Sequence, residues 1–108
     1  MTYFNEHFIG VYDVNGTFLY KFGHKGEKEG QFHNARGLAV FGGDKLLVCD
    51  YTNHRVQIWT QDGQFLRSFG SRGSGLGQMD GPTNVAVTPD GKVLVLERDG
   101  KRVQVWRQ

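Results

Sequence analysis

The chain has 108 residues, a formal net charge of +2 and a sequence pI of about 8.8, so it fits one small domain. This mild basic balance does not by itself indicate nucleic acid as a partner. The single cysteine excludes a disulfide within the chain and fits a reducing, cytoplasmic compartment. No apolar run is long enough to span a bilayer and no secretory signal opens the sequence, so we expect no membrane association.

The first strand patterns lie at residues 8–12 and 17–22. Asn15-Gly16 between them is a strong hairpin signal, because both central residues of a type I′ turn need positive φ. A polar loop punctuated by glycines follows at residues 23–36. We interpret residues 1–13 as the end of a preceding structural unit.

A series of short strands separated by turn signals begins after this loop. Residues 37–41 are apolar and small and have no polar face, so we expect a strand buried on both sides. The first series has strands expected at residues 37–41, 45–50, 55–59 and 64–69. After a second glycine-rich loop, at 70–83, the series recurs with strands expected at residues 84–88, 92–97 and 102–107.

This recurrence is a sequence repeat without insertion. Gly63 stands 47 residues after Gly16, and the same offset superimposes many identical residues. They include the pairs Phe18/Phe65, Phe22/Phe69, Gln31/Gln78, Arg55/Arg102, Gln57/Gln104 and Trp59/Trp106. A period in the forties with several strands per unit is typical of a β-propeller blade. We divide the chain into the end of a preceding repeat at 1–13, one repeat at 14–60 and a second at 61–107.

The predicted fold class is all-β, with about two four-stranded antiparallel blades plus partial strands. Propellers typically have four to eight blades, so this chain forms an incomplete ring by itself. Two explanations stay open: a fragment of a longer propeller, or a small protein that oligomerises. A homotrimer with about two blades per chain would supply about six. An isolated monomer would expose apolar sheet faces and unpaired strand edges.

Asn53-His54-Arg55, within the stretch VCDYTNHRVQIW, resembles the NHL repeat. Gly30-Gln31-Phe32 and the hairpin at residues 62–66 support the resemblance, and the second copy matches more weakly because it lacks the Asn-His pair. The resemblance implies a propeller blade, usually one of about six in a ring. NHL propellers of tripartite-motif ubiquitin ligases and their relatives bind protein or RNA, and other NHL propellers occur in extracellular lyases.

Two opposite charges recur at the same spacing in both copies. Asp50 and Arg55 flank a tight turn, and Glu97 and Arg102 repeat them 47 residues later. Across a hairpin such residues can face each other. A ligand-binding pair is one reading and a structural ion pair is the other. Recurrence favours the structural ion pair, because a catalytic residue would be expected in one blade only.

The remaining chemistry-bearing residues give no enzymatic pattern. Cys49 has no fixed basic partner in the sequence and is expected to be a buried apolar residue. The histidines show no metal-site spacing; they are His7, His24, His33 and His54. Amidating lyases of the wider superfamily are expected to bind metal through histidine, yet we predict no metal, no cofactor and no enzymatic activity here.

Propeller geometry places the inter-blade loops and the turns between second and third strands on one face. That face would collect a basic, partly aromatic set: Lys25, Lys28, Arg36, Tyr51, Asn53, His54, Arg72, Arg98 and Lys101. Acidic residues within the same loops dilute it, so we place a protein partner before RNA. The predicted function is a non-enzymatic protein-binding propeller segment, with substrate recognition in a ubiquitin-ligase-type protein as its setting. An RNA-binding surface is the alternative, and a metal-dependent lyase or hydrolase is the second.

Overall fold

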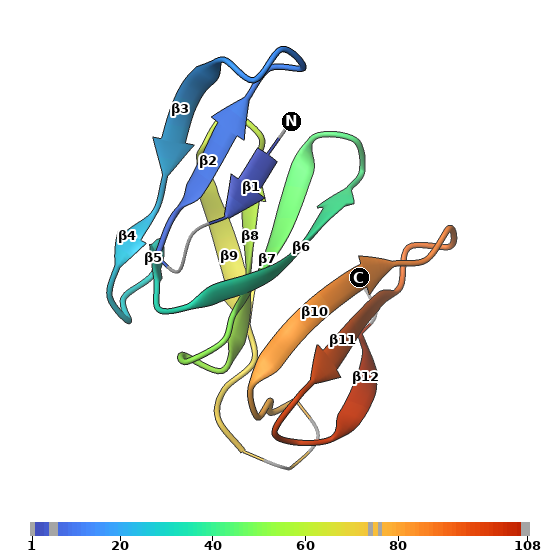
Figure 1. Cartoon of the computed structure of the whole chain (residues 1–108). Helices are drawn as coiled ribbons and strands as arrows, with labels where there is room; N and C mark the ends of the chain where they lie inside the picture. Colours follow the sequence, from blue (N-terminus) through green and yellow to red (C-terminus); the bar gives the residue numbers. More distant parts are fainter. Residues whose placement is uncertain (1, 5–6, 74, 76, 107–108) are drawn as a thin grey trace.

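The computed structural model describes residues 2–4, 7–73, 75 and 77–106, which form three successive antiparallel sheets (Figure 1). The N-terminal sheet has the order β1 (Thr2–Phe4), β2 (Ile9–Tyr12), β3 (Phe18–Phe22). The central sheet has the order β6 (Ala35–Phe41), β7 (Lys45–Asp50), β8 (Arg55–Thr60), β9 (Phe65–Phe69). The C-terminal sheet has the order β10 (Pro82–Val87), β11 (Val93–Glu97), β12 (Arg102–Trp106).

The prediction of an all-β chain made of propeller blades in an incomplete ring is confirmed. The central sheet is a complete four-stranded blade, and the sheets on either side have three strands each among the described residues. The central sheet straddles the two sequence repeats, because β9 belongs to the second repeat and β6 to β8 belong to the first. The part of the chain that the structure describes holds no helix long and apolar enough to cross a membrane.

The loops between sheets share a backbone geometry. In the first loop, β4 (His24–Lys25) and β5 (Gln31–Phe32) pair in parallel, with Lys25 opposite Phe32. In the second loop, Arg72 and Met79 form the same parallel bridge 47 residues later. The sequence repeat therefore extends from the strands into the irregular segments.

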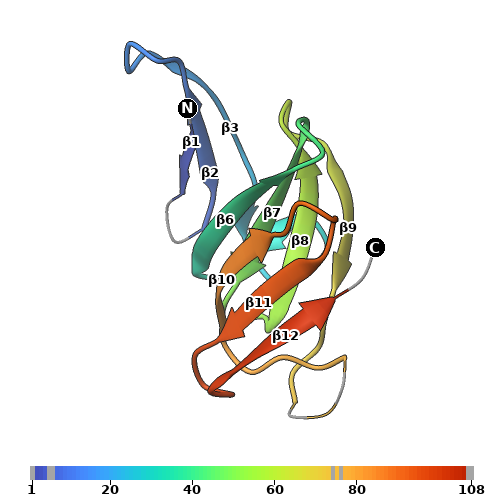
Figure 2. The ribbon, with the colours of Figure 1, turned by 90° about the vertical axis from the view of Figure 1, so that its right-hand side faces the viewer.

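The expectation that the strand at residues 37–41 is buried on both sides is wrong. β6 is half-exposed, and Val40 keeps 56% of its surface accessible. The reason is its place at the inner edge of the central sheet, where only β7 pairs with it and β10 lies beside it (Figures 1 and 2). β7 and β8, in the middle of the sheet, are the strands buried on both faces.

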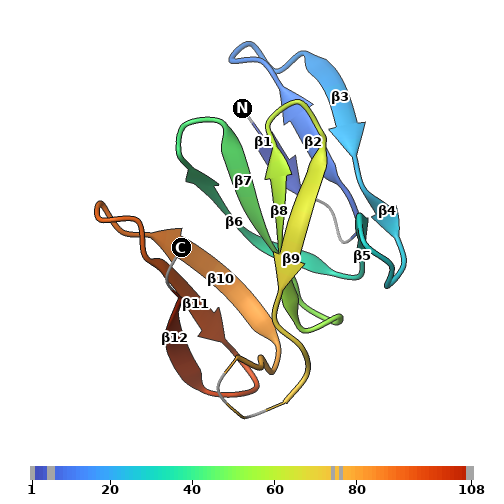
Figure 3. The same ribbon diagram turned by 180° about the vertical axis from the view of Figure 1, so that it is seen from behind.

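Successive side chains of β7 point to opposite faces of the central sheet, and each face has its own core. Leu47 and Cys49 join a cluster with Val85, Val93 and Val95 of the C-terminal sheet. The intervening residues face the N-terminal sheet, in a second cluster that contains Ile9, Phe22, Phe32, Leu46, Val48 and Trp59. β9 lies at the outer edge of the central sheet, opposite β6 (Figure 3). The central sheet is thus packed between its two neighbours.

Aromatic rings join the sheets at equivalent positions. Trp59 lies 4.7 Å from Phe22 of the N-terminal sheet, measured between ring centroids. Trp106 lies 4.7 Å from Phe69 of the central sheet, which is the same contact one repeat later. Such pairs contribute about 0.5–1.5 kcal/mol beyond their area burial. The repeated Phe and Trp therefore fix each sheet against the one before it.

Replacing Leu47 by Ala is expected to lower the free energy of unfolding by about 2–5 kcal/mol, because Leu47 is 0% exposed and its loss leaves a cavity between two sheets. Leu66, 42% exposed on β9, provides the matched control. Leu66→Ala is expected to change stability by less than about 0.5 kcal/mol. Urea unfolding followed by tryptophan fluorescence measures both; equal effects would contradict the two-sided core.

Candidate functional site

The predicted site residues gather at one end of the sheets, here called the loop end: residues 23–36, 51–54, 70–73, 75, 77–81 and 98–101. In the central sheet, Tyr51 N–H donates to the Asn34 carbonyl at 3.2 Å. In the C-terminal sheet, Arg98 N–H donates to the Gly81 carbonyl at 2.8 Å. Each loop that enters a sheet is therefore bonded to the turn between that sheet's second and third strands.

A buried carboxylate organises the loop end of the central sheet. Asp50 is 0% exposed, and its Oδ2 accepts from Arg55 Nε at 2.8 Å and from Gln57 Nε2 at 3.0 Å. Its Oδ1 accepts from the His33 N–H at 2.7 Å. Asn53 Nδ2 also donates to Oδ2, at 3.0 Å. All of these donors satisfy a charge that would otherwise be costly to bury.

The same donors also hold the loop backbone. Arg55 donates through one terminal nitrogen to the carbonyls of Lys28 and Gln31, each at 2.8 Å. Gln57 Nε2 donates to the Gln31 carbonyl as well, and its Oε1 accepts from Trp59 Nε1 at 3.0 Å. Because the only strand pairing in this loop is the short one between β4 and β5, these side chains provide hydrogen bonds that longer strands would otherwise supply.

The C-terminal sheet repeats the arrangement around Glu97, which is also 0% exposed. Glu97 Oε2 accepts from Arg102 Nε at 2.9 Å and from Gln104 Nε2 at 2.7 Å, and Oε1 accepts from the Asp80 N–H at 2.8 Å. Arg102 and Gln104 both donate to the Gln78 carbonyl. Burial opposes ionisation of Glu97, but these hydrogen bonds and the Arg102 charge outweigh it and lower the pKa. All the polar groups are engaged within the chain, so neither carboxylate is positioned to bind a ligand.

Three of the predicted partner-binding residues contact other parts of the chain. Asn53 Nδ2 donates to the Gly26 carbonyl at 2.9 Å. Tyr51 donates its hydroxyl to Asp99 at 2.9 Å, and this bond is the main reason that its pKa is raised. His54 has a left-handed backbone with φ 54°, and its Nδ1 accepts from the Gly81 N–H at 3.1 Å. Tyr51 and His54 thus fasten the central sheet to the C-terminal sheet.

The six remaining members of the predicted set are exposed cations: Lys25, Lys28, Arg36, Arg72, Arg98 and Lys101. Within the described residues, no ion pair neutralises any of them. The Arg36 guanidinium lies 5.1 Å from the centre of the Tyr51 ring, a cation–π contact. Four carboxylates are interspersed among them, at Glu27, Glu29, Asp80 and Asp99. The loop end therefore carries a cationic surface that extends over two sheets.

The opposite end of the sheets has the reverse charge. Its turns carry Asp13, Asp44, Asp62 and Asp90. The cations beside them are paired, with Lys45 Nζ 3.5 Å from Asp44 and Lys92 Nζ 3.2 Å from Asp90. Asp13 Oδ1 accepts from the N–H groups of Asn15 and Thr17, which stabilises the Asn15-Gly16 hairpin. The cations of these turns are thus paired, whereas the six cations of the loop end have no carboxylate partner among the described residues.

The other residues singled out in the sequence form no reactive constellation among the described residues. Cys49 is 0% exposed, and burial raises the pKa of its thiol to about 12. His7 and His33 lie with ring centroids 5.5 Å apart. His24 is exposed on β4. In the part of the chain that the structure describes, no three His, Cys, Asp or Glu side chains gather where they could hold a metal ion.

Sequence reasoning did not assign roles to the paired glutamines. Gln57 and Gln104 each bridge a buried carboxylate and a loop carbonyl. Their identity at an offset of 47 residues was a visible signal, since a glutamine inside a strand repeated in both copies indicates a conserved contact pattern within the chain. Asp99, the acceptor for Tyr51, had no such signal because the first copy has Thr52 in its place.

Comparison with known proteins finds a family match in one segment of the chain. Residues 32–59, which extend from β5 through most of β8, match the family model of the NHL repeat. This segment contains the Asp50 network and the donors that hold the first loop. No curated protein matches the chain.

Acid is expected to remove the contribution of Glu97 to stability. Its folded pKa lies below the ordinary value of 4.5, so its stabilisation is complete above that value and disappears as pH falls through the folded pKa. Glu97→Gln should flatten the acid side of a plot of unfolding free energy against pH. Glu29→Gln, the same change at an exposed loop position, is the control and should leave the plot unchanged.

Cys49 is expected to resist thiol reagents in the native protein. With a pKa of about 12 and a fully buried side chain, almost no thiolate is available at pH 8. Labelling by Ellman's reagent should therefore be far slower in buffer than in concentrated urea. Rates within about tenfold of each other would show that the space between the central and C-terminal sheets opens readily.

Proposed function

We propose that this NHL-repeat chain is a non-enzymatic, protein-binding segment of a β-propeller, and that its loop end is the docking surface. The observation that carries this proposal is the separation of charge: six exposed cations lie at one end, and the cations at the other end are paired. NHL repeats are typically interaction modules, and this chain supplies a rigid platform with projecting cationic side chains.

An acidic segment of a partner protein fits this surface best. Lys25 and Lys28 extend from the first loop, and Arg72 extends from the second, so a partner can contact two sheets at once. The carboxylates among them would offer hydrogen-bond acceptors to the partner's backbone. Charge pairing of this kind mainly sets specificity and association rate.

The geometry around Tyr51 disfavours RNA. Binding of single-stranded RNA depends on aromatic rings whose faces are open to stacked bases. Arg36 lies over the ring of Tyr51, and the Tyr51 hydroxyl is held by Asp99. Tyr51 is the only phenylalanine, tyrosine or tryptophan in the predicted surface. Interspersed carboxylates would also repel a phosphate backbone.

Substrate recognition within a ubiquitin-ligase-type protein is the setting that the NHL resemblance suggests. In that setting the chain would hold a target protein and perform no chemistry itself. The buried thiol of Cys49 and the structural engagement of Asp50 and Glu97 agree with a binding role.

Charge reversal at Lys28, Arg72 and Lys101 is expected to weaken binding of an acidic peptide at least tenfold, because three favourable pairings become repulsive. The probe is a fluorescein-labelled glutamate decapeptide, measured by anisotropy at several salt concentrations. The matched control reverses Lys21, Lys45 and Lys92, which produces the same net charge with all changes outside the loop end.

Equal affinities of the two triple variants would contradict the assignment of the loop end. A uridine decamer serves as the comparator in the same assay. The outcome that would replace the protein partner with RNA is tighter binding of this decamer than of the peptide. The logarithm of its binding constant should then fall linearly with the logarithm of the salt concentration.

A further inference from the structure

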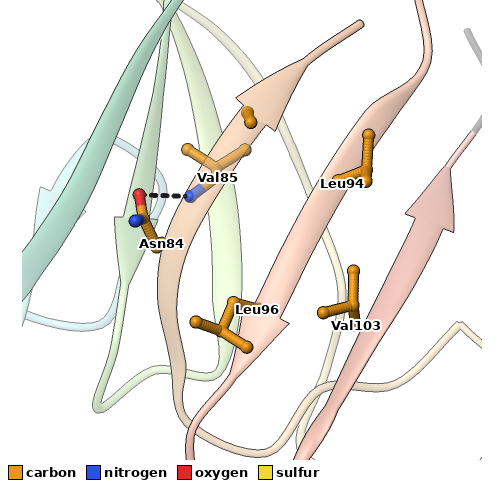
Figure 4. Close-up of a pocket in the computed structure, with 6 residues that line it drawn as sticks. Asn84, Val85, Leu94, Leu96 and Val103 are labelled. Carbon is orange, nitrogen blue, oxygen red and sulfur yellow. Dashed lines mark hydrogen bonds between the residues drawn. The ribbon is translucent and has the colours of Figure 1, made fainter.

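The C-terminal sheet has an apolar face that nothing in the described chain covers. On the side away from the central sheet, Leu96 is 45% exposed, Val103 54% and Val105 57%. Part of this face is a shallow groove, shown in Figure 4, whose lining residues are Asn84, Val85, Ala86, Leu94, Leu96 and Val103. Neighbouring exposed apolar side chains of this kind on one sheet typically mark an interface.

The sequence repeat indicates what kind of surface covers this face. At an offset of 47 residues, Leu96, Val103 and Val105 correspond to Cys49, Val56 and Ile58 of the central sheet. Those three counterparts are at most 2% exposed, because the C-terminal sheet packs on them. We call the side of a sheet that faces the preceding sheet its first face. The exposed face is the opposite side, so it is of the type that packs on the first face of another blade.

In the described chain, the first face of the central sheet is the one whose covering sheet could be displaced by a C-terminal sheet. The first face of the central sheet carries Phe32, Leu46, Val48 and Trp59 and is covered by the N-terminal sheet. Strand β2 in this cover corresponds to β12 at twice the repeat offset. Ile9 takes the place of Val103, Val11 that of Val105, and Tyr12 that of Trp106. The N-terminal sheet thus occupies the position that a C-terminal sheet would occupy.

The N-terminal sheet lacks the polar network that stabilises the other two sheets. Phe8 stands where they have Arg55 and Arg102, and Gly10 stands where they have Gln57 and Gln104. β1 has only three residues and pairs with β2 at three positions. Without the carboxylate, arginine and glutamine contacts of the other two sheets, this sheet is the easiest part of the described chain to displace.

We propose that the chain assembles head to tail, with the C-terminal sheet of one copy replacing residues 2–12 on the central sheet of a second copy. β12 would pair with β3 of the second copy in the register that β2 has now, which places Val103 opposite Phe22 and Val105 opposite Tyr20. The product is a four-stranded blade, β10-β11-β12 from one copy and β3 from the next. It has the same architecture as the central sheet.

Such a heterologous contact closes into a ring when the rotation between copies permits it. Each copy contributes one complete and one composite blade, so a propeller of four to eight blades would need about two to four copies. The proposal concerns the sheet faces and leaves the cationic loop end exposed, so it stands independently of the proposed function.

Light scattering coupled to size-exclusion chromatography of the full chain provides the first test. The mass should rise with concentration from 12.2 kDa to a small multiple of that value. Leu96→Glu should abolish the rise, because a charge would be buried in the new contact. Leu66→Glu makes the same change at a 42% exposed position on β9, outside the contact, and should leave association unchanged. Circular dichroism verifies that both variants fold.

Two further variants distinguish cap displacement from simple pairing of two exposed faces. Val11→Glu weakens the existing cover without touching the C-terminal sheet, so it should strengthen association by roughly tenfold for each 1.4 kcal/mol lost from the cover. The double variant Tyr20→Cys with Val105→Cys should form a disulfide between copies on oxidation. A mass of 12.2 kDa at all concentrations, or association that Val11→Glu leaves unchanged, would overturn the proposal.

Discussion

The buried carboxylate is the constraint on which each complete unit of this structure depends. Asp50 and Glu97 lie at the ends of β7 and β11, where the chain leaves the sheet, and both are fully buried. A buried ion pair does not necessarily stabilise a fold, since desolvation offsets the attraction. Its value here lies in the additional donors. Arg55 and Arg102 each bond a carboxylate and two loop carbonyls. The pair therefore specifies the path of a long loop that has few backbone partners.

These loops place successive sheets side by side, and an internal sheet is therefore packed on both of its faces. Each loop returns the chain from the outer edge of one sheet to the inner edge of the next, so the sheets follow each other in sequence order (Figure 3). A sheet with neighbours on both sides has no polar face, which is why β7 buries five of its six residues. The terminal sheets of the described chain have one neighbour each, and the same residue types then become exposed surface. The apolar face of the C-terminal sheet is a direct consequence of repetition.

The sequence was sufficient to predict the strands of the central and C-terminal sheets because turn chemistry and the repeat offset reinforce each other. Asn15-Gly16 and Asp62-Gly63 mark hairpins, and the structure has Gly16 and Gly63 at positive φ of 85° and 93°. β1 was not predicted, since three residues give no recognisable period. The short strands β4 and β5 were not predicted, since they lie within the loop expected at residues 23–36. The two-sided burial expected of residues 37–41 was wrong because composition alone does not distinguish an inner edge strand from a central one.

The site was less accessible to sequence reasoning than the fold. Position at the loop end could be inferred from topology, but the contacts of individual side chains could not. Tyr51 bonds Asp99, which lies 48 residues away in another sheet, and His54 accepts from Gly81, 27 residues away. Neither separation equals the repeat offset, so no pattern in the sequence indicates these contacts. They depend on the angle between two sheets, which the packing of the core sets.

The two ends and the two faces of the chain differ in physical character, and this difference separates their roles. Burial of an apolar face lowers the free energy, so these faces favour contact with another sheet over contact with a soluble ligand. The cations at the loop end keep their hydration and act over a distance of about 8 Å at physiological salt. Because Tyr51 and His54 fasten the two sheets at this end, any partner that contacts both meets a fixed spacing of charges. Association through the faces would repeat that spacing around a ring. Weak contacts of one partner with several copies would then add up to strong overall binding.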